Sequence, residues 1–431
     1  MNVERAGPLR RKRAALVAGA ILVLVVTVGA VATSHLRKAS PGRIVSNEPD
    51  AIPASFPRRS YAPGDRAMLH VEGKGGAFIL QVFRVGAERL RPPRDNVLMG
   101  VPVSGPRRVL QRGETTVVQL DIGPRWPSGF YFARLSRPGS VGFAPFVLRP
   151  RTLGENRVLV VMPTHTWQAY NFRDVDDDGT GDTWYADPKV KTVVLTRPYL
   201  NRGVPPHFRG YDRAFLRWLQ RTGKKADFVA DDDLEAIASG DELARRYDLV
   251  VFPGHEEYIA GHVLDVAQRY RDLGGNLAFL SANTFFYAVE RRGDRLLGRE
   301  LWSKRGRPSA PLTGSTYVGW FEDRYPNRPY IVTGARIASW LFRGTGLRNG
   351  DSFGSYGIEV DARDERSPAG TRVLARINDI FGKGHTAEMT YYETKAGAKV
   401  FSAGVMNFGG SLEYEPQSTM MENLWRRLAK P

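Results

Sequence analysis

The sequence predicts an α/β protein that is preceded by an all-β module and one transmembrane helix. Between residues 58 and 150, short alternating apolar segments are separated by turn residues, as in a small β-sandwich. After residue 150, buried-strand patterns alternate with segments of helical spacing, which predicts βαβ units and a mostly parallel sheet flanked by helices. An uncharged apolar run near the N-terminus predicts the membrane helix.

The composition is that of a globular protein with two or three domains. The chain has 431 residues, of which 42% are hydrophobic and 25% are charged. Cysteine is absent, which excludes disulfides, thiolate metal sites and a cysteine nucleophile. The net charge of +17 would suit nucleic acid or anionic lipid, but no helix-turn-helix, RNP-like or zinc-finger pattern accompanies it. We therefore expect an arginine-rich solvated surface and no nucleic-acid partner.

The N-terminal segment predicts the location of the protein. Residues 14–33 form an apolar stretch long enough to span a bilayer, and residues 10–13 before it are all basic. By the positive-inside rule, residues 1–13 form a cytoplasmic tail and the domains lie outside the cytoplasm, attached to the cell membrane. A cleaved signal peptide is the alternative, because residues 30–32 resemble a cleavage site. Residues 34–57 are polar and proline-containing, which predicts a tether.

The all-β module, residues 58–150, is predicted from five strand candidates, at 67–71, 77–85, 115–122, 129–135 and 143–148. The turn sequences YAPGD and RWPSG support an immunoglobulin-like sandwich. The module contains no catalytic constellation, so we expect it to act as a spacer or to present substrate.

The α/β domain is predicted for residues 151–431. Its expected strands are 157–162, 227–230, 247–253, 276–280 and 399–403, and its clearest helices are 211–221, 259–270 and 418–428. The region 300–385 is poorly periodic, and we expect it to cover the sheet or to insert beside it.

Polar and aromatic side chains follow three of these strands. His165, Tyr170 and an acidic loop follow the first strand, GHEEY (254–258) follows another, and SANTFF (281–286) follows a third. Because ligands bind at the carboxyl edge of open α/β sheets, we expect these segments to converge in the functional site.

The motifs THTWQAYN, TWYADPKVKTVVLTRPYLN, GHEEY, GGNLAFLSANTFFY and MTYYETKAGAKVFSAG occur in this order along the chain. In these motifs the sequence resembles the large (β) subunit of N,N-dimethylformamidase and its relatives, over most of residues 60–430. The resemblance implies a glutamine-amidotransferase-like α/β domain and one iron ion held by two tyrosines and a glutamate. Carried over, these ligands are Tyr170, Tyr185 and Glu257, and the residues that match positions around the metal centre are His255, Asn283 and Glu393.

The donor set has a chemical rationale of its own. Phenolate and carboxylate are hard oxygen donors that suit Fe³⁺, and three protein ligands leave positions for water and a substrate carbonyl. Glu393 or His255 would then handle protons. Two alternatives stay open: the tyrosines are aromatics hydrogen-bonded at the sheet edge, or Tyr211 takes the place of Tyr185. The characterised enzyme is soluble and works with a small partner subunit, whereas this chain carries the predicted anchor.

A second metal site is predicted in the acidic loop. Its oxygen-bearing residues have the spacing of an EF-hand calcium loop through nine positions, with Gly179 at the sharp turn. The usual glutamate at position 12 is replaced by Tyr185. An exposed acidic turn without calcium is the alternative. The predicted Ca²⁺ ligands are Asp174, Asp176, Asp178, Thr180 and Asp182.

The leading functional hypothesis is an extracytoplasmic, metal-dependent hydrolase that acts on a C–N bond of the amide or formamide type in a small molecule. The alternative is a non-catalytic surface protein that uses the same pocket and the calcium loop to bind a ligand. Cysteine-dependent amidotransfer is excluded because the chain has no cysteine.

Overall fold

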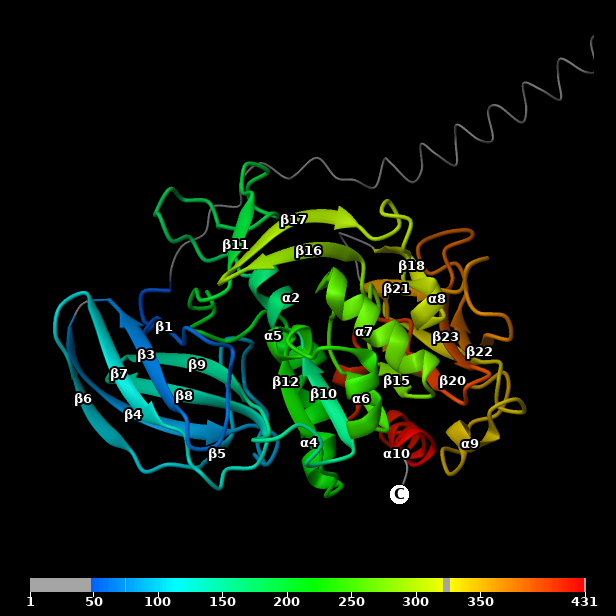
Figure 1. Ribbon diagram of the computed structural model, residues 1–431, viewed down its shortest axis with the longest axis horizontal. Helices are drawn as coiled ribbons and strands as arrows, with labels where there is room; N and C mark the ends of the chain where they lie inside the picture. Colours follow the sequence, from blue (N-terminus) through cyan, green and yellow to red (C-terminus); the bar gives the residue numbers. More distant parts are fainter. Residues whose placement is uncertain (1–47, 74, 321–325, 430–431) are drawn as a thin grey trace, which may run out of the picture.

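The computed structural model describes residues 48–73, 75–320 and 326–429. Figure 1 shows an N-terminal β-sandwich beside a larger domain of sheets and helices. More of the described chain lies in strands than in helices.

The N-terminal part consists of two sheets that pack face to face around one hydrophobic core. The alternation in strand β3 explains this packing. Ala67, Leu69 and Val71 are buried in the core between the sheets, and the residues between them are more exposed. The sheets have the orders β1-β3-β7 and β2-β9-β8-β4-β5, and β6 pairs with β4. Strand β1 falls in the predicted tether. The strands are β1 (Ala54–Ser55), β2 (Ser60–Tyr61), β3 (Arg66–Glu72), β4 (Gly76–Arg84), β5 (Val101–Pro102), β6 (Arg107–Gln111), β7 (Thr115–Asp121), β8 (Gly129–Arg137) and β9 (Ser140–Leu148).

The larger domain is built on a nine-stranded sheet of order β12-β10-β13-β15-β24-β23-β22-β19-β20. Its first five strands are parallel: β12 (Asp227–Ala230), β10 (Val158–Met162), β13 (Leu249–Phe252), β15 (Asn276–Phe279) and β24 (Lys399–Ser402). The remaining four continue the sheet in antiparallel fashion: β23 (Ala387–Glu393), β22 (Arg372–Ile377), β19 (Arg328–Val332) and β20 (Ser352–Tyr356).

Two smaller sheets lie beside the carboxyl ends of the parallel strands. One contains β11 (Thr192–Val194), β17 (Arg295–Leu301), β16 (Tyr287–Arg292) and β14 (Tyr258–Ala260), and the other β18 (Thr316–Trp320) and β21 (Glu359–Ala362). The helices are α2 (Thr164–Ala169), α3 (Phe208–Tyr211), α4 (Arg213–Arg221), α5 (Asp231–Glu235), α6 (Gly240–Arg246), α7 (Gly261–Asp272), α8 (Ala310–Thr313), α9 (Ser339–Phe342), α10 (Gln417–Leu428) and the 3₁₀ helix η1 (Gly409–Ser411).

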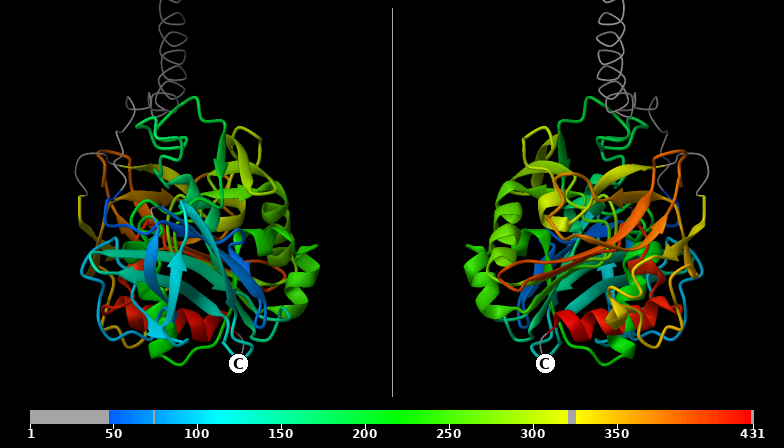
Figure 2. Two further views of the ribbon diagram at one scale, coloured as in Figure 1. Left: turned by 90° about the vertical axis from the view of Figure 1, so that its left-hand side faces the viewer. Right: turned by 90° about the vertical axis from the view of Figure 1, so that its right-hand side faces the viewer.

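The parallel strands are buried on both faces. In β10, Val158 and Val160 join a core that contains α4, α10 and residues of the sandwich strand β8, whereas Leu159 and Val161 join the core under α6 and α7. The side views show helices on both sides of these strands (Figure 2). Continuous apolar runs such as Val158–Met162 fold as strands here because both of their faces are covered.

The predicted fold class is wrong. The chain is mostly β with large mixed sheets, not an α/β domain with a mostly parallel, glutamine-amidotransferase-like sheet. The difference arises in the poorly periodic region, because its segments form strands: β19, β20 and β22 extend the main sheet, and β18 and β21 pair with each other. Strand β20 forms the edge of the sheet and β19 lies next to it. Both strands are partly exposed, so they lack the apolar runs that mark the central strands.

The predicted membrane helix finds no support in the structure. None of the helices in the described ranges is long and apolar enough to cross a membrane. Residues 14–33, together with the predicted cytoplasmic tail, lie outside the described residues. The expected location outside the cytoplasm stays a prediction.

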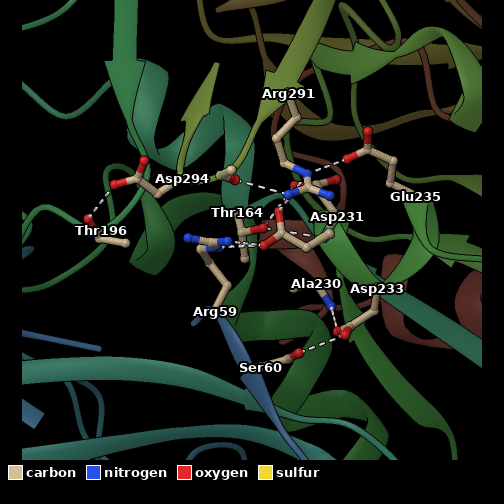
Figure 3. Close-up of polar contacts among 12 residues, drawn as sticks. Arg59, Ser60, Thr164, Thr196, Ala230, Asp231, Asp233, Glu235, Arg291 and Asp294 are labelled. Carbon is tan, nitrogen blue, oxygen red and sulfur yellow. Dashed lines mark hydrogen bonds and ion pairs between the residues drawn. The ribbon is translucent and has the colours of Figure 1, made fainter. Parts of the chain in front are cut away.

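A polar cluster joins the sandwich to the larger domain (Figure 3). Arg59, which precedes β2, donates from Nε to Asp232 Oδ2 at 2.7 Å, and Ser60 Oγ donates to Asp233 Oδ1 at 2.7 Å. The other oxygen of Asp232 lies 2.8 Å from Nε2 of the buried His165. Helix α5 therefore forms hydrogen bonds both to the sandwich, through Arg59 and Ser60, and to the start of α2, through His165.

Candidate functional site

Three segments meet beyond the carboxyl ends of β10 and β13. Tyr170 directly follows α2, Tyr185 lies in the long loop before β11, and Glu257 lies between β13 and β14. The backbone of this meeting point is fixed from α2, because Thr166 Oγ1 accepts a hydrogen bond from the Glu257 amide at 3.0 Å.

The structure brings together the two tyrosines and the glutamate that the sequence predicts as iron ligands. The hydroxyl of Tyr185 donates to that of Tyr170 at 2.9 Å and lies 3.3 and 3.4 Å from the two carboxylate oxygens of Glu257. The two phenol rings stack with their centroids 4.5 Å apart. Three oxygen-bearing side chains therefore converge on one point.

Two further residues complete this tyrosine cluster. The hydroxyl of the buried Tyr258 lies 2.5 Å from that of Tyr185. The Arg299 guanidinium, from β17, lies 5.3 Å from the centre of the Tyr185 ring and 5.1 Å from that of Tyr287. Arg299 thus supplies a positive charge beside the phenols.

His255, Asn283 and Glu359 form a second layer against Glu257. The Nε2 atom of His255 lies 3.6 Å from Glu257 Oε2 and 3.7 Å from Glu359 Oε2. Within the described ranges, His255 Nε2, Asn283 Oδ1 and Glu359 Oε2 are buried without a hydrogen-bond partner. Such unsatisfied polar atoms are costly in a core, and a bound ligand or water that hydrogen-bonds to them would offset that cost.

Asn283 has a strained backbone. Its φ of 55° lies in the left-handed region, which asparagine tolerates better than most residues. The amide of Asn283 donates to Asp361 Oδ1 in β21 at 2.8 Å, which holds this conformation. Strain of this kind is common at functional sites.

Burial shifts the ionisable groups of the site toward their neutral forms. Burial raises the pKa of Glu257 to about 7, although hydrogen bonds from Tyr170 and the charge of Arg299 oppose this shift. Burial, together with the charge of Glu257, raises the pKa of both Tyr170 and Tyr185 well above the ordinary value. Burial lowers the pKa of His255 to about 3, so its imidazole is neutral. A cation at the shared point would stabilise the anionic forms that burial disfavours.

These donors fit a hard cation. Oxygen ligands about 2.0 Å from a small octahedral ion lie about 2.9 Å apart, which is comparable to the separation of the Tyr170 and Tyr185 hydroxyls. Phenolate and carboxylate ligands suit ferric iron, as the sequence analysis expects.

Glu393 lies away from the cluster. It is the last residue of β23, pairs with Lys399 at the start of β24, and is bound by Arg427 at 2.9 Å. It lines a separate surface hollow with Arg271 and Lys395. From the sequence, Glu393 is expected beside the metal centre, but the carboxyl group found there, near His255, is that of Glu359. Glu359 was not predicted from the sequence.

The alternative ligand, Tyr211, lies beside the cluster. Its ring stacks on His207 with centroids 5.1 Å apart and lies 6.4 Å from the His255 ring. The geometry therefore favours Tyr185, whose hydroxyl reaches both Tyr170 and Glu257.

The acidic loop brings together part of its predicted set. One carboxylate oxygen of each of Asp174, Asp176 and Asp182 lies within 4.8 Å of the others. Asp178 is not part of this group, and its Oδ1 accepts from the Thr180 amide at 2.7 Å.

Three residues of the site escaped prediction: Tyr258, Arg299 and Glu359. Tyr258 stands within the GHEEY motif, and its position next to Glu257 was an available clue. Arg299 and Glu359 belong to β17 and β21, whose sheets were not predicted, so no local pattern marked them.

Comparison with known proteins identifies the family. The model of the "N,N-dimethylformamidase beta subunit-like, C-terminal" family matches residues 102–422. The chain belongs to this family. The resemblance inferred from the motifs is thereby confirmed, and the match covers the tyrosine cluster and the whole main sheet.

Two curated members of the N,N-dimethylformamidase family are similar to the chain. The beta subunit from Paracoccus aminophilus is 24% identical over 402 residues, which cover 70% of this chain and 52% of the relative. The subunit from Alcaligenes sp. is 24% identical over 280 residues, which cover 56% of this chain and 36% of the relative. The chain thus spans between about a third and a half of the length of these relatives.

Among solved structures, a cycloisomaltooligosaccharide glucanotransferase from Paenibacillus sp. aligns with a TM-score of 0.18 and 15% identity, over 28% of this chain and 18% of that chain. At this TM-score the likeness carries no structural conclusion.

Proposed function

We propose that the protein is a metal-dependent hydrolase of small amides, in which Tyr170, Tyr185 and Glu257 hold one ferric ion. The observation that carries the proposal is the convergence of three oxygen donors from separate loops, with Tyr185 Oη 2.9 Å from Tyr170 Oη and 3.3 Å from Glu257. A buried carboxyl and two buried phenols are each costly to ionise without a cation, and a ferric ion would offset that cost.

The family supports the reaction class. The two curated relatives are named as beta subunits of N,N-dimethylformamidase, and the family model that matches residues 102–422 carries the same description. We extend to this chain the cleavage of a C–N bond in a formamide-type substrate. Bound at the cluster, the ion would polarise the amide carbonyl and increase the acidity of an attacking water.

The neighbouring side chains supply the proton transfers. His255 is neutral and its Nε2 lacks a hydrogen-bond partner in the described part of the chain, so it can accept a hydrogen bond from water and take its proton once the ion has increased the acidity of that water. Burial raises the pKa of Glu359 well above its ordinary range, so this carboxyl can carry a proton to the departing amine nitrogen. The Asn283 side chain hydrogen-bonds to Glu257 and Glu359, which lowers the pKa of both carboxyl groups and opposes the effect of burial.

Turnover of N,N-dimethylformamide by the full chain, expressed with ample iron, tests this function. Protein that contains bound iron should release the amine product, and protein without iron should not. Glu359→Gln should retain most of the iron and lower kcat by about 10²-fold or more, because it removes a proton donor and not a ligand. Glu257→Gln should lose iron as well, since an anionic ligand is removed.

Glu393→Gln is the matched control, because this substitution makes the same carboxylate-to-amide change as Glu359→Gln at a residue outside the cluster. It should leave kcat and iron content unchanged. Iron-replete protein that turns over no amide would refute the hydrolase and favour the ligand-binding alternative. A loss of turnover in Glu393→Gln equal to that in Glu359→Gln would refute the assignment of Glu359.

A further inference from the structure

The loop between the two proposed tyrosine ligands contains a second group of oxygen donors that the proposed reaction does not use. Asp174, Asp176 and Asp182 each offer one carboxylate oxygen, and these oxygens lie within 4.8 Å of one another. Three carboxylates this close repel one another unless a cation or protons neutralise them.

The second observation is the burial of Asp174. Its side chain is only 4% exposed. Its Oδ2 accepts from the Gly179 amide at 2.8 Å, but its Oδ1 is buried with no hydrogen-bond partner among the residues described. A buried carboxylate oxygen without a donor costs free energy, which a metal ion at the acidic group would offset.

Within the described ranges, the arginines beside the loop form no ion pair with the three carboxylates. Arg173 pairs with Glu72 at 3.2 Å. The Arg197 guanidinium donates to the backbone carbonyl oxygens of Arg173 and Asp182, at 3.2 and 2.8 Å. It therefore binds the backbone at both ends of the acidic loop. In the described part of the chain, the carboxylate oxygens of the group are therefore left without a hydrogen bond from either arginine.

The backbone is arranged for inward-pointing oxygens. Gly179 has a φ of 86°, and a Cβ there would meet open space, so its turn depends on conformational freedom. The Asp178 amide donates to Asp176 at 3.3 Å, and the Val175 amide donates to Asp182 Oδ2 at 2.7 Å. These bonds fix the side chains of the group before an ion binds.

We propose that Asp174, Asp176 and Asp182 bind one Ca²⁺ ion. Oxygen-only ligands and a flexible loop suit calcium, whereas Mg²⁺ demands a stricter octahedron. The hydroxyl of Tyr185, which occupies the place of the usual bidentate glutamate, is bound to Tyr170 instead. With that ligand missing, we expect a Kd of roughly 10⁻⁴–10⁻³ M, in the range of extracellular calcium modules.

Calcium titration of the full chain, followed by thermal unfolding and calorimetry, tests the site. Calorimetry should give one Ca²⁺ per chain. At 10 mM Ca²⁺ the Tm should rise by roughly 2 °C or more, because the ion binds only the folded loop. The same concentration of Mg²⁺ should produce a smaller rise in Tm. Asp174→Asn and Asp176→Asn should abolish the rise, since asparagine keeps the backbone hydrogen bond but removes the charge.

The matched control is Asp177→Asn. Asp177 is exposed, lies in the same loop and stands outside the group of three, and asparagine tolerates its φ of 58°. It should keep the full calcium response. Glu257→Gln should also keep it, which distinguishes this ion from one bound at the tyrosine cluster. The proposal is overturned if wild type shows no Tm rise and no binding heat, if Asp176→Asn responds like wild type, or if Asp177→Asn loses as much as Asp176→Asn.

Discussion

Buried carboxyl groups dominate the chemistry of single residues around the site. Burial raises the pKa of Glu257 and of Asp361 to about 7. Glu359 shifts in the same direction, first because of burial and then because of the charge of Glu257. The folded chain therefore holds protons here at a pH at which the unfolded chain has released them.

Asp361 gives a test of this effect at one residue. Its folded pKa is raised from 3.8 to about 7, so between these values the folded state binds more protons and stability falls as pH rises. An asparagine side chain at this position cannot ionise. We expect Asp361→Asn to gain stability relative to wild type from pH 4 to pH 8, by up to about 4 kcal/mol.

Urea unfolding at several pH values measures this difference. The pH dependence, not the absolute value, is diagnostic, because the amide also changes the hydrogen bond from the Asn283 amide. A difference between the two proteins that does not vary with pH would show that Asp361 is ionised in both the folded and the unfolded chain.

At the scale of elements, the central strands were predictable because their environment is simple. The strand Asp227–Ala230 was predicted at its observed residues, and the strand at 158–162 within one residue, since both are short runs buried on both faces and closed by turn or cap residues. The antiparallel extension was not predictable, because its strands alternate weakly and β19 pairs with β22, although β20 and β21 lie between them in the sequence.

The difference between the parallel strands and the antiparallel extension also explains which site residues could be predicted. Tyr170 and Glu257 follow predicted parallel strands, whose carboxyl ends meet at one edge, so their convergence could be anticipated. Glu393 ends a strand antiparallel to β24, which places it at the opposite, amino edge, beside Lys399. Glu359 reaches the cluster from β21, in a region without a clear pattern.

At the scale of the whole molecule, the sandwich and the larger domain share a core and the Arg59–Asp232 pair. The two side chains are 11% and 18% exposed. His165 and Arg59 together lower the pKa of Asp232 despite its burial. Arg59→Met should therefore lower the free energy of unfolding by roughly 3 kcal/mol, because it leaves a largely buried carboxylate short of one partner.

The neighbouring Arg58 provides the comparison for urea unfolding. Its side chain is 55% exposed and pairs with Asp65 at 3.3 Å, so Arg58→Met should cost less than about 1 kcal/mol. Equal losses in the two variants would mean that the buried pair contributes no more to stability than a surface ion pair.

The most direct test of the proposed function is the visible absorption spectrum of the full chain loaded with ferric iron. Phenolate ligands to Fe³⁺ give a visible charge-transfer band, with one iron per chain expected. Tyr170→Phe and Tyr185→Phe should each weaken or shift the band, whereas Tyr211→Phe, whose ring lies beside His255, should leave it in place. A colourless chain that binds no iron, or a band that survives Tyr185→Phe and disappears in Tyr211→Phe, would contradict the proposed site.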